Sequence, residues 1–526
     1  MEATTDIAIG PRRWVRIAAL ALLLAVLPIL LFSRLRLRET PLERDEGEYA
    51  YAGQLMLQGI PPYSLACNMK LPGTYAAYAV IMAVFGQTLG GIRLGLLLVN
   101  AATVLLLCLL GRRLFSIDVG LAAGAAYALL SFGLAVMGTA AHATHFVVLP
   151  ALAGLLLLLR AMESGRAATL FWSGVLFGVA FLMKQHGIFF GMFGAGWLLW
   201  KHSGGWVRTA RRLAIFGAAA ALPFALTCII LWWAGVFPKF WFWTFHYARA
   251  YASENTLADG IDALKEQIPS LLHDNWALWA LSGVGLVAAW WKRQSRPAAL
   301  FLTGFLVFST AAVCPGLYFR EHYFVLMLPA IALGAGVVAG RFRGWGVWLF
   351  AASLIFSVVS QGKFLFRETP YEISRELYAL NPFPEAIPIS EYIRRHSAPD
   401  TRIAVLGSEP EIYFYSHRHS ATGYIYTFAL SEDQPYAAQM RAEMIHEVSA
   451  AQPEYVVLVD SLDLWAYRSE GRPTVFSWWG GYAPGRYDMA GIADIISYSR
   501  TEYRWGAAAA AYKPESDYIV AIYKKR

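Results

Sequence analysis

The chain has 526 residues, of which 57% are hydrophobic and only 15% are charged, and its formal net charge is +8. A water-soluble protein of this length could not bury so much apolar surface, whereas repeated apolar runs of about 16 to 20 residues match the thickness of a bilayer. Most basic residues lie in short segments between these runs, which argues against nucleic-acid binding and indicates that they set the topology. Four cysteines without CxxC spacing predict neither a metal cluster nor a disulfide framework.

The first apolar run, residues 17–32, follows Arg12, Arg13 and Arg16, as the apolar core of a signal peptide would. It ends in Ser-Arg-Leu-Arg-Leu-Arg and has no cleavage site of small residues. The sequence therefore predicts an uncleaved first span.

Basic clusters then recur along the chain, at Arg112-Arg113, Arg160 with Arg166, 201–212, 292–296, and Arg341 with Arg343. If all of them are cytoplasmic, the spans between them must occur in pairs. This predicts about eleven transmembrane helices, with the N-terminus inside and the C-terminus outside. They are placed near 15–33, 92–110, 119–138, 145–160, 168–183, 186–200, 213–234, 275–291, 298–313, 322–340 and 345–360.

Residues 71–89 are also long enough to form a span. Counting them would place Arg112-Arg113 outside and invert every later cluster. We therefore expect a helix that lies at the outer surface or dips into it. The outer loop 34–90 is then acidic.

The character of the sequence changes after about Lys363. We expect a transmembrane module over 1–363, a linker over 364–380 and an extracytoplasmic α/β domain over 381–526. Within that domain the patterns predict helices at 385–396 and 434–451 and strands at 402–407 and 454–460. The aromatic run FSWWGGY, residues 476–482, fits either a buried core or a sugar-stacking surface.

Three carboxylates, Asp45, Glu46 and Glu48, lie within four residues of the outer loop, at the start of a helical pattern that ends at Gly59. A structural explanation is available, because Asp45 followed three residues later by Glu48 matches a capping box. On that interpretation Asp45 is only the N-cap of the helix.

Other ionisable residues fall at the predicted outer ends of spans, where they are functional candidates. Each has a structural alternative: Lys70 and Arg320 could snorkel to headgroups, Arg93 could pair with an acidic residue, Lys184 could cap a helix and His322 could be an interfacial histidine. Their shared level at the membrane boundary favours function. The candidates are Lys70, Arg93, Lys184 with Gln185 and His186, and Arg320 to Tyr323.

Five motifs together carry a resemblance: RDEGEYAYAGQLMLQGIPPY, KLPG, Arg93-Leu94, FLMKQHG and FREHYFVLMLP. The chain resembles the GT-C-fold glycosyltransferases, and within them the bacterial protein O-mannosyltransferase-like and aminoarabinose-transferase-like group. The resemblance implies transfer of a sugar from a polyprenyl-phosphate donor to an acceptor hydroxyl at the outer face of the cytoplasmic membrane. It implies that Asp45 is the general base and that Glu46 orients Asp45 or the acceptor. A carboxylate can take the acceptor's proton, and cations can stabilise the leaving phosphate. The resemblance assigns the lipid phosphate to Lys70, Arg93, Lys184, His322 and Tyr323.

Two departures limit this resemblance. In the aminoarabinose-transferase branch the residue three after the aspartate is usually arginine, whereas here it is Glu48, which argues against lipid A as acceptor. The loop after the third span often carries a carboxylate, and here it reads AAHATHF, with His142 and His145. These histidines fit a polar loop, acceptor positioning together with Glu48 and Gln185, or metal binding, and a divalent metal is left open. The alternatives to an enzyme are a transporter or flippase of lipid-linked sugars and an inactive glycan-binding scaffold.

Overall fold

The computed structural model describes residues 11–201, 205–291, 293–342, 344–460 and 471–526. Packing divides the chain into two compact units, to each of which three segments contribute. Unit 1 comprises residues 1–37, 94–226 and 255–368, and unit 2 comprises residues 38–93, 227–254 and 369–526. Two members of the basic clusters, Lys292 and Arg343, lie outside the described residues.

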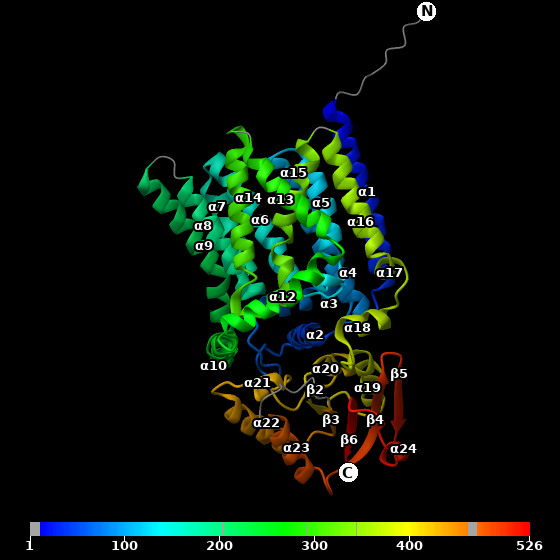
Figure 1. Cartoon of the computed structure of the whole chain (residues 1–526). Coiled ribbons are helices and arrows are strands. Elements are labelled where there is room, and N and C mark those ends of the chain that lie inside the picture. Colours follow the sequence, from blue (N-terminus) through cyan, green and yellow to red (C-terminus); the bar gives the residue numbers. More distant parts are fainter. Residues whose placement is uncertain (1–10, 202–204, 292, 343, 461–470) are drawn as a thin grey trace, which may run out of the picture. The chain divides into compact units, whose positions relative to one another are not determined.

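Unit 1 is a bundle of mainly apolar helices (Figure 1). Each apolar run that the sequence predicts as a span contains one of them. The helices are α1 (Pro11–Arg36), α4 (Leu89–Leu114), α5 (Ile117–Leu130), α6 (Ala143–Ser164), α7 (Ala167–Met183), α8 (Ile188–Trp200), α9 (Trp206–Trp233), α12 (Leu257–His273), α13 (Trp276–Trp291), α14 (Arg296–Ala311), α15 (Leu328–Arg341), α16 (Trp345–Ser360) and α17 (Gly362–Phe366). The first residues of α4 and the last residues of α9 belong to unit 2.

In the part of the chain that the structure describes, four helices are long and apolar enough to cross a membrane, namely α1, α4, α6 and α9. Two predicted spans are interrupted. The run 119–138 leaves the α-helix at Leu130, and Met137 then adopts a φ of 52°. The run 322–340 begins as a 3-10 helix, η6 (Glu321–Leu326), before α15 starts with Pro329 in its first turn. The number and orientation of the spans stay predictions.

Small residues allow α15 to pack closely against two neighbours, α5 and α13. A Cβ atom added at Gly285 of α13 would lie 1.8 Å from the carbonyl oxygen of Gly334 in α15. On the other side of α15, a Cβ atom at Gly336 would lie 2.7 Å from the carbonyl oxygen of Val119 in α5. Glycine is therefore required at these helix crossings, as is common where helices pack without large side chains between them.

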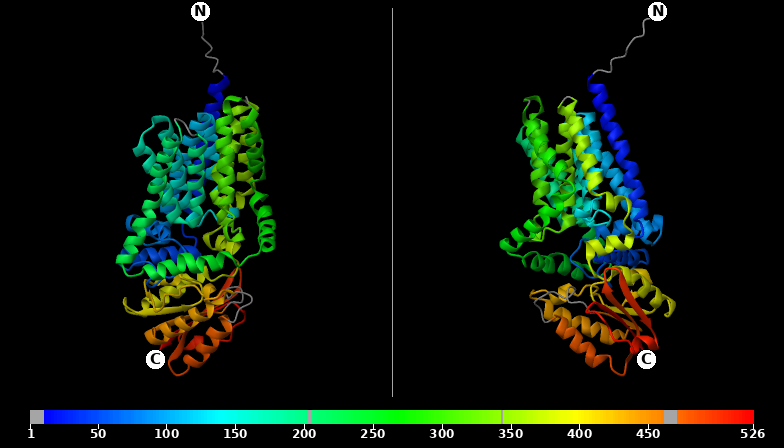
Figure 2. Two further views of the ribbon diagram at one scale, coloured as in Figure 1. Left: turned by 90° about the vertical axis from the view of Figure 1, so that its left-hand side faces the viewer. Right: turned by 45° about the vertical axis from the view of Figure 1, so that its right-hand side comes forward.

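Unit 2 contains a six-stranded mixed sheet with the strand order β2-β1-β3-β6-β4-β5. The strands are β1 (Arg402–Leu406), β2 (His419–Ser420), β3 (Tyr455–Asp460), β4 (Tyr487–Ser497), β5 (Arg500–Trp505) and β6 (Ile519–Lys525). β1 pairs in parallel with β2 and β3, and the pairs β3·β6, β6·β4 and β4·β5 are antiparallel. The strands nearest the C-terminus, drawn in red, lie side by side (Figure 2). The buried, β-branched run of β3 fits its central place in the sheet. Strands predicted at 402–407 and 454–460 are confirmed.

The helices of unit 2 come from all three of its segments. They are α2 (Arg44–Leu57), α3 (Gly73–Phe85), α10 (Phe237–Trp241), the π-helix η3 (Phe242–Tyr247), α11 (Ala248–Ala252), α18 (Pro370–Tyr378), α19 (Phe383–Arg395), α20 (Glu411–Ser416), α21 (Phe428–Ser431), α22 (Ala437–Ala451), α23 (Gly471–Tyr482) and α24 (Ala507–Ala510). The helices predicted at 385–396 and 434–451 correspond to α19 and α22.

Helix α3 lies within residues 71–89, the segment that the charge pattern excludes from the predicted spans. Its 13 residues extend for about 20 Å, which is shorter than the hydrocarbon core of a bilayer, about 30 Å. It packs against α2, where a Cβ atom at Gly53 would lie 3.0 Å from the backbone nitrogen of Ala79. Its length favours the surface helix over a span.

Two further sequence interpretations can be compared with the structure. The predicted linker 364–380 contains the capped helix α18, and packing joins residues 38–93 and 227–254 to the C-terminal segment in unit 2. The domain boundaries at 363 and 381 stay a prediction. In the run 476–482, Trp479 is only 4% exposed and packs against Tyr487 and Tyr523, which favours a buried core at that position.

Candidate active site

The candidate general base lies on α2, a helix whose start is fixed by Glu43. The Glu43 side chain accepts a hydrogen bond from the backbone N–H of Glu46 at 2.8 Å, so Glu43 and not Asp45 is the N-cap. The interpretation of Asp45 as the cap is wrong, because the helix begins one residue before it, at Arg44. Asp45 therefore has no capping role, and its carboxylate is engaged elsewhere.

The three carboxylates of α2 have different surroundings. Glu46 is buried and forms a two-pronged ion pair with Arg93, whose Nη2 lies 2.9 Å from Glu46 Oε2. Arg93 also donates to the carbonyl oxygen of Thr40 at 3.1 Å. This arrangement favours the alternative in which Arg93 pairs with an acidic residue over binding of the lipid phosphate. Within unit 2, the pair also connects α2 with Arg93 in the first residues of α4.

Glu48 is buried as well, and several donors converge on its carboxylate. Lys70 Nζ lies 2.8 Å and Asn68 Nδ2 lies 2.7 Å from Glu48 Oε2, and the Tyr75 hydroxyl donates to Oε1. A residue so surrounded is poorly placed to meet an acceptor itself. Its geometry suits the positioning of Lys70.

Asp45 differs from both neighbours because its side chain is 25% exposed, against 1% for Glu46 and 0% for Glu48. Lys70 Nζ donates to Asp45 Oδ1 at 2.6 Å, and the Tyr426 hydroxyl donates to the same oxygen at 3.0 Å. Asp45 is thus the carboxylate of α2 that is both held in place and accessible. Asn68, Tyr75 and Tyr426 are site residues that the sequence reasoning missed.

Charge and burial compete in this network. Burial lowers the pKa of Lys70, but the carboxylates of Asp45 and Glu48 outweigh burial, so the pKa is raised and the side chain stays an ammonium ion. Burial raises the pKa of Glu48 despite the nearby ammonium group of Lys70. Burial, reinforced by Asp45 and Glu46, raises the pKa of Glu43 to about 8. The Lys70 cation is therefore what stabilises the paired carboxylates.

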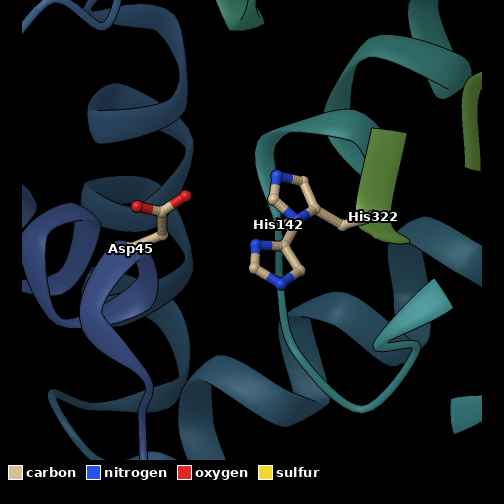
Figure 3. A group of neighbouring side chains, drawn as sticks. All are labelled: Asp45, His142 and His322. Carbon is tan, nitrogen blue, oxygen red and sulfur yellow. The ribbon is translucent and has the colours of Figure 1, made fainter. Parts of the chain in front are cut away.

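A second group of candidate residues lies in unit 1, where Lys184 and His186 meet the 3-10 helix η6. Lys184 Nζ lies 3.8 Å from the ring centroid of Tyr323, and the His186 ring contacts the same tyrosine at 4.9 Å. His142, the N-cap of α6, stacks on His322 with ring centroids 4.0 Å apart and an interplanar angle of 12° (Figure 3). The structure therefore brings together five sequence candidates, namely Lys184, His186, His322, Tyr323 and His142.

The surroundings of three other candidate residues do not favour a role in substrate binding. His145 is fully buried in α6, and its Nδ1 lies 3.1 Å from Asn100 Oδ1. Gln185 lies in the 3-10 turn η2 (Gln185–Gly187) beside Lys184. Glu321 accepts a hydrogen bond from Gln267 at 3.1 Å. The burial of His145 favours a packing role over the acceptor positioning that the sequence left open.

The stacked pair His142 and His322 is the feature that bears on the question of a metal. Neutral imidazole is a common ligand of zinc and other divalent transition metals. Two imidazoles supply two of the three protein ligands that a catalytic zinc site has. A divalent metal stays a prediction.

Comparison with known proteins finds similar sequences over part of the chain. Residues 70–233 match the family model described as "Dolichyl-phosphate-mannose-protein mannosyltransferase". The chain is 31% identical over 239 residues to the undecaprenyl phosphate-alpha-4-amino-4-deoxy-L-arabinose arabinosyl transferases of Pseudomonas aeruginosa and Pseudomonas paraeruginosa. The match spans 40% of this chain and 40% of each relative's length.

Two solved structures share the fold over nearly the whole chain. ArnT from Cupriavidus metallidurans, bound to undecaprenyl phosphate, matches with a TM-score of 0.58 and 15% identity over 96% of this chain and 97% of ArnT. The oligosaccharyltransferase AglB from Archaeoglobus fulgidus, in complex with an inhibitory peptide and a dolichol-phosphate, matches with a TM-score of 0.51 and 11% identity over 93% of this chain and 74% of AglB. The predicted fold class, a multi-pass helical membrane protein with a C-terminal α/β region, is confirmed.

Proposed function

We propose that this chain, which has the GT-C fold, is a membrane glycosyltransferase that moves a sugar from a polyprenyl-phosphate donor to an acceptor hydroxyl. The observation that carries the proposal is the accessible carboxylate of Asp45, held by Lys70 and Tyr426 next to two buried, ion-paired glutamates. The partial matches to an arabinosyl transferase and to a mannosyltransferase family support the same class of reaction.

The reaction assigns the proton and the charge to different groups. The acceptor oxygen attacks the anomeric carbon of the donor, and Asp45 takes the proton of the acceptor hydroxyl. The bond between the anomeric carbon and the phosphate oxygen breaks, and its electron pair leaves with the polyprenyl phosphate. Lys70, Lys184, His322 and Tyr323 are proposed to stabilise that phosphate, since cations and hydrogen-bond donors favour the negative charge as it develops.

The location and the topology belong to the same proposal. The chain is a membrane protein, and the basic clusters between its apolar runs favour a cytoplasmic N-terminus. Unit 2, which includes the C-terminal α/β region, would then face the outer side of the cytoplasmic membrane. Lipid-linked sugars delivered at that side are the donors that fit, with an acceptor glycan, lipid or protein as the second substrate.

The experiment that tests the proposal is release of polyprenyl phosphate by the purified chain in lipid nanodiscs. A panel of polyprenyl-phosphate sugars is supplied with crude envelope extract as the source of acceptor. We expect release from at least one donor, and a loss of about 10²–10⁴-fold in Asp45→Asn, the usual contribution of a general base. Asp488→Asn, an exposed aspartate of the same unit, serves as the matched control and should retain full activity.

Each other outcome removes a part of the proposal. A fully active Asp45→Asn enzyme would exclude Asp45 as the base. No release from any donor would favour the transporter or the scaffold interpretation over an enzyme.

A further inference from the structure

Unit 2 contains a cavity of about 280 Å³ whose walls come from its three chain segments. One wall is the start of the π-helix η3, with Phe242 and Trp243, and another is α22, with Glu443 and Glu447. Its volume falls at the lower limit of ordinary small-molecule sites, about 300 Å³, so it suits one ring and not an extended chain. π-helical turns are rare in proteins, and those that do occur often lie at functional sites.

Aromatic side chains give the cavity rigid walls. Phe242 meets Tyr436 edge to face with centroids 5.0 Å apart, and Trp243 meets Tyr424 in the same way at 5.8 Å. These two pairs fix the orientation of four lining residues. Aromatic side chains provide apolar contact area at a low cost in conformational entropy.

Polar groups in the lining are held by hydrogen bonds rather than left mobile. Glu443 accepts from the Tyr424 hydroxyl and, at 2.8 Å, from Gln439 Nε2. Glu447 accepts from the backbone N–H of Gly423 at 3.0 Å. With Lys239 as the only cation among the lining residues described, two carboxylates face one ammonium group. This balance favours neutral or cationic ligands that donate hydrogen bonds, and it disfavours anions.

The cavity is connected to the candidate base by two short stretches of chain. Cys67 in the lining is three residues from Lys70, and Tyr424 is two residues from Tyr426. Lys70 and Tyr426 are the two donors to Asp45 Oδ1. Because a chain spans at most about 3.6 Å per residue, the Cα atoms of Cys67 and Lys70 lie within about 11 Å of each other and those of Tyr424 and Tyr426 within about 7 Å. The cavity lining and the two donors to Asp45 therefore belong to the same part of unit 2.

We propose that this cavity binds one sugar ring of the acceptor, in neutral or amino-sugar form, next to the hydroxyl that Asp45 deprotonates. The ring packs its C–H face on the aromatic pairs, and its hydroxyl or amino groups donate to Glu443 and Glu447. The inference rests on the proposed transferase function, which it extends from an acceptor hydroxyl to an acceptor carbohydrate.

Direct binding tests the cavity without requiring transfer. The full chain in nanodiscs is titrated with methyl glucoside, methyl glucosaminide and methyl glucuronide, and saturation transfer from protein to ligand is measured by NMR. We expect transfer to the glucoside and the glucosaminide and much weaker transfer to the anionic glucuronide. Tyr436→Ala should abolish the signal. Glu443→Gln, which keeps the shape of the side chain, should weaken binding about tenfold, as for a lost hydrogen bond to a charged group.

Two variants serve as matched controls in the same unit. Tyr498→Ala removes a tyrosine that is 58% exposed, and Glu391→Gln neutralises a glutamate on α19, outside the cavity lining. Both should bind as wild type does. Equal saturation transfer in wild type, Tyr436→Ala and Glu443→Gln, or none in wild type, would overturn the inference.

A kinetic measurement then separates this inference from the proposed function. Glu443→Gln should raise the KM for acceptor by a larger factor than it lowers slow hydrolysis of the lipid-linked donor in the absence of acceptor. Absence of donor turnover in wild type would contradict the proposed function but leave the binding result readable. Normal donor turnover with an unchanged acceptor KM would contradict only the acceptor site.

Discussion

Replacing Lys70 with methionine should separate the structural contribution of this side chain from its contribution to transfer. Lys70 Nζ lies 2.6 Å from Asp45 Oδ1 and 2.8 Å from Glu48 Oε2, and the Glu48 side chain is fully buried. Methionine retains most of the aliphatic stem but leaves the Glu48 carboxylate without its cation. Breaking a buried pair in this way costs about 3–5 kcal/mol. We expect the lower end, about 3 kcal/mol, because Asn68 and Tyr75 still donate to Glu48 and Lys70 is 19% exposed.

The assay is a double-mutant cycle that combines Lys70→Met with Glu48→Gln. Thermal unfolding of the purified variants in one detergent gives their relative stability, and polyprenyl-phosphate release gives their activity. The double variant should recover most of the lost stability, because the unpaired buried charge is gone. Its activity should remain low, because Asp45 and the leaving phosphate still lack the ammonium group. Lys265→Met, at a 71% exposed position paired with Asp262, should change stability by less than about 1 kcal/mol.

Two results would refute this reasoning. A Lys70→Met protein as stable as wild type would mean that the carboxylates do not depend on the cation. A double variant that regains full transfer would mean that Lys70 acts only through the stability of the fold.

Three further predictions concern the attachment of α2. The pKa of Glu43 is raised to about 8, so the folded state binds this proton more tightly than the unfolded state. The free energy of unfolding should therefore fall by a few kcal/mol as pH rises from about 4.5 to about 8. In Glu43→Gln, the melting temperature measured over this pH range should change less than in wild type. Gly47→Ala places a Cβ atom 2.6 Å from the backbone nitrogen of Glu411 in α20 and should lower the free energy of unfolding by about 1–3 kcal/mol. The control Ala52→Gly, in the same helix, should lower it by only about 1 kcal/mol, the difference in helix propensity. Arg93→Lys loses the two-pronged contact with Glu46. It should therefore lower the melting temperature more than it lowers the release of polyprenyl phosphate per folded molecule. A larger effect on release than on the melting temperature would instead support Arg93 as a ligand of the lipid phosphate.

The sequence predicts the local elements of this chain well, because periodicity is a local property. The strands β1 and β3 and the helices α19 and α22 occur where apolar spacing places them. The sequence offers Asp45 as a possible cap of α2 where the structure has Glu43. Both residues are acidic and lie two residues apart, and only the backbone shows which one precedes the first turn.

The partners of the candidate base could not be predicted in the same way. Tyr426 is 381 residues from Asp45 along the chain, and no motif connects them. Unit 2 is assembled from residues 38–93, 227–254 and 369–526, a combination that no composition boundary reveals. The cavity that we propose to bind the acceptor is lined by residues from all three segments. No pattern within any one segment predicts it.

Helix geometry explains why three carboxylates in four residues can be stable and still leave one of them usable. Successive residues turn by about 100° around an α-helix, so Asp45 and Glu48, three positions apart, lie on nearly the same side, and Glu46 points elsewhere. One lysine can therefore serve both Asp45 and Glu48, while Arg93 serves Glu46. Because burial is complete for Glu46 and Glu48 and partial for Asp45, the buried pairs fix the helix and the exposed carboxylate remains for chemistry. A cluster that at first suggests mutual repulsion is in this way an arrangement of structural ion pairs that leaves one carboxylate accessible, that of the proposed base Asp45.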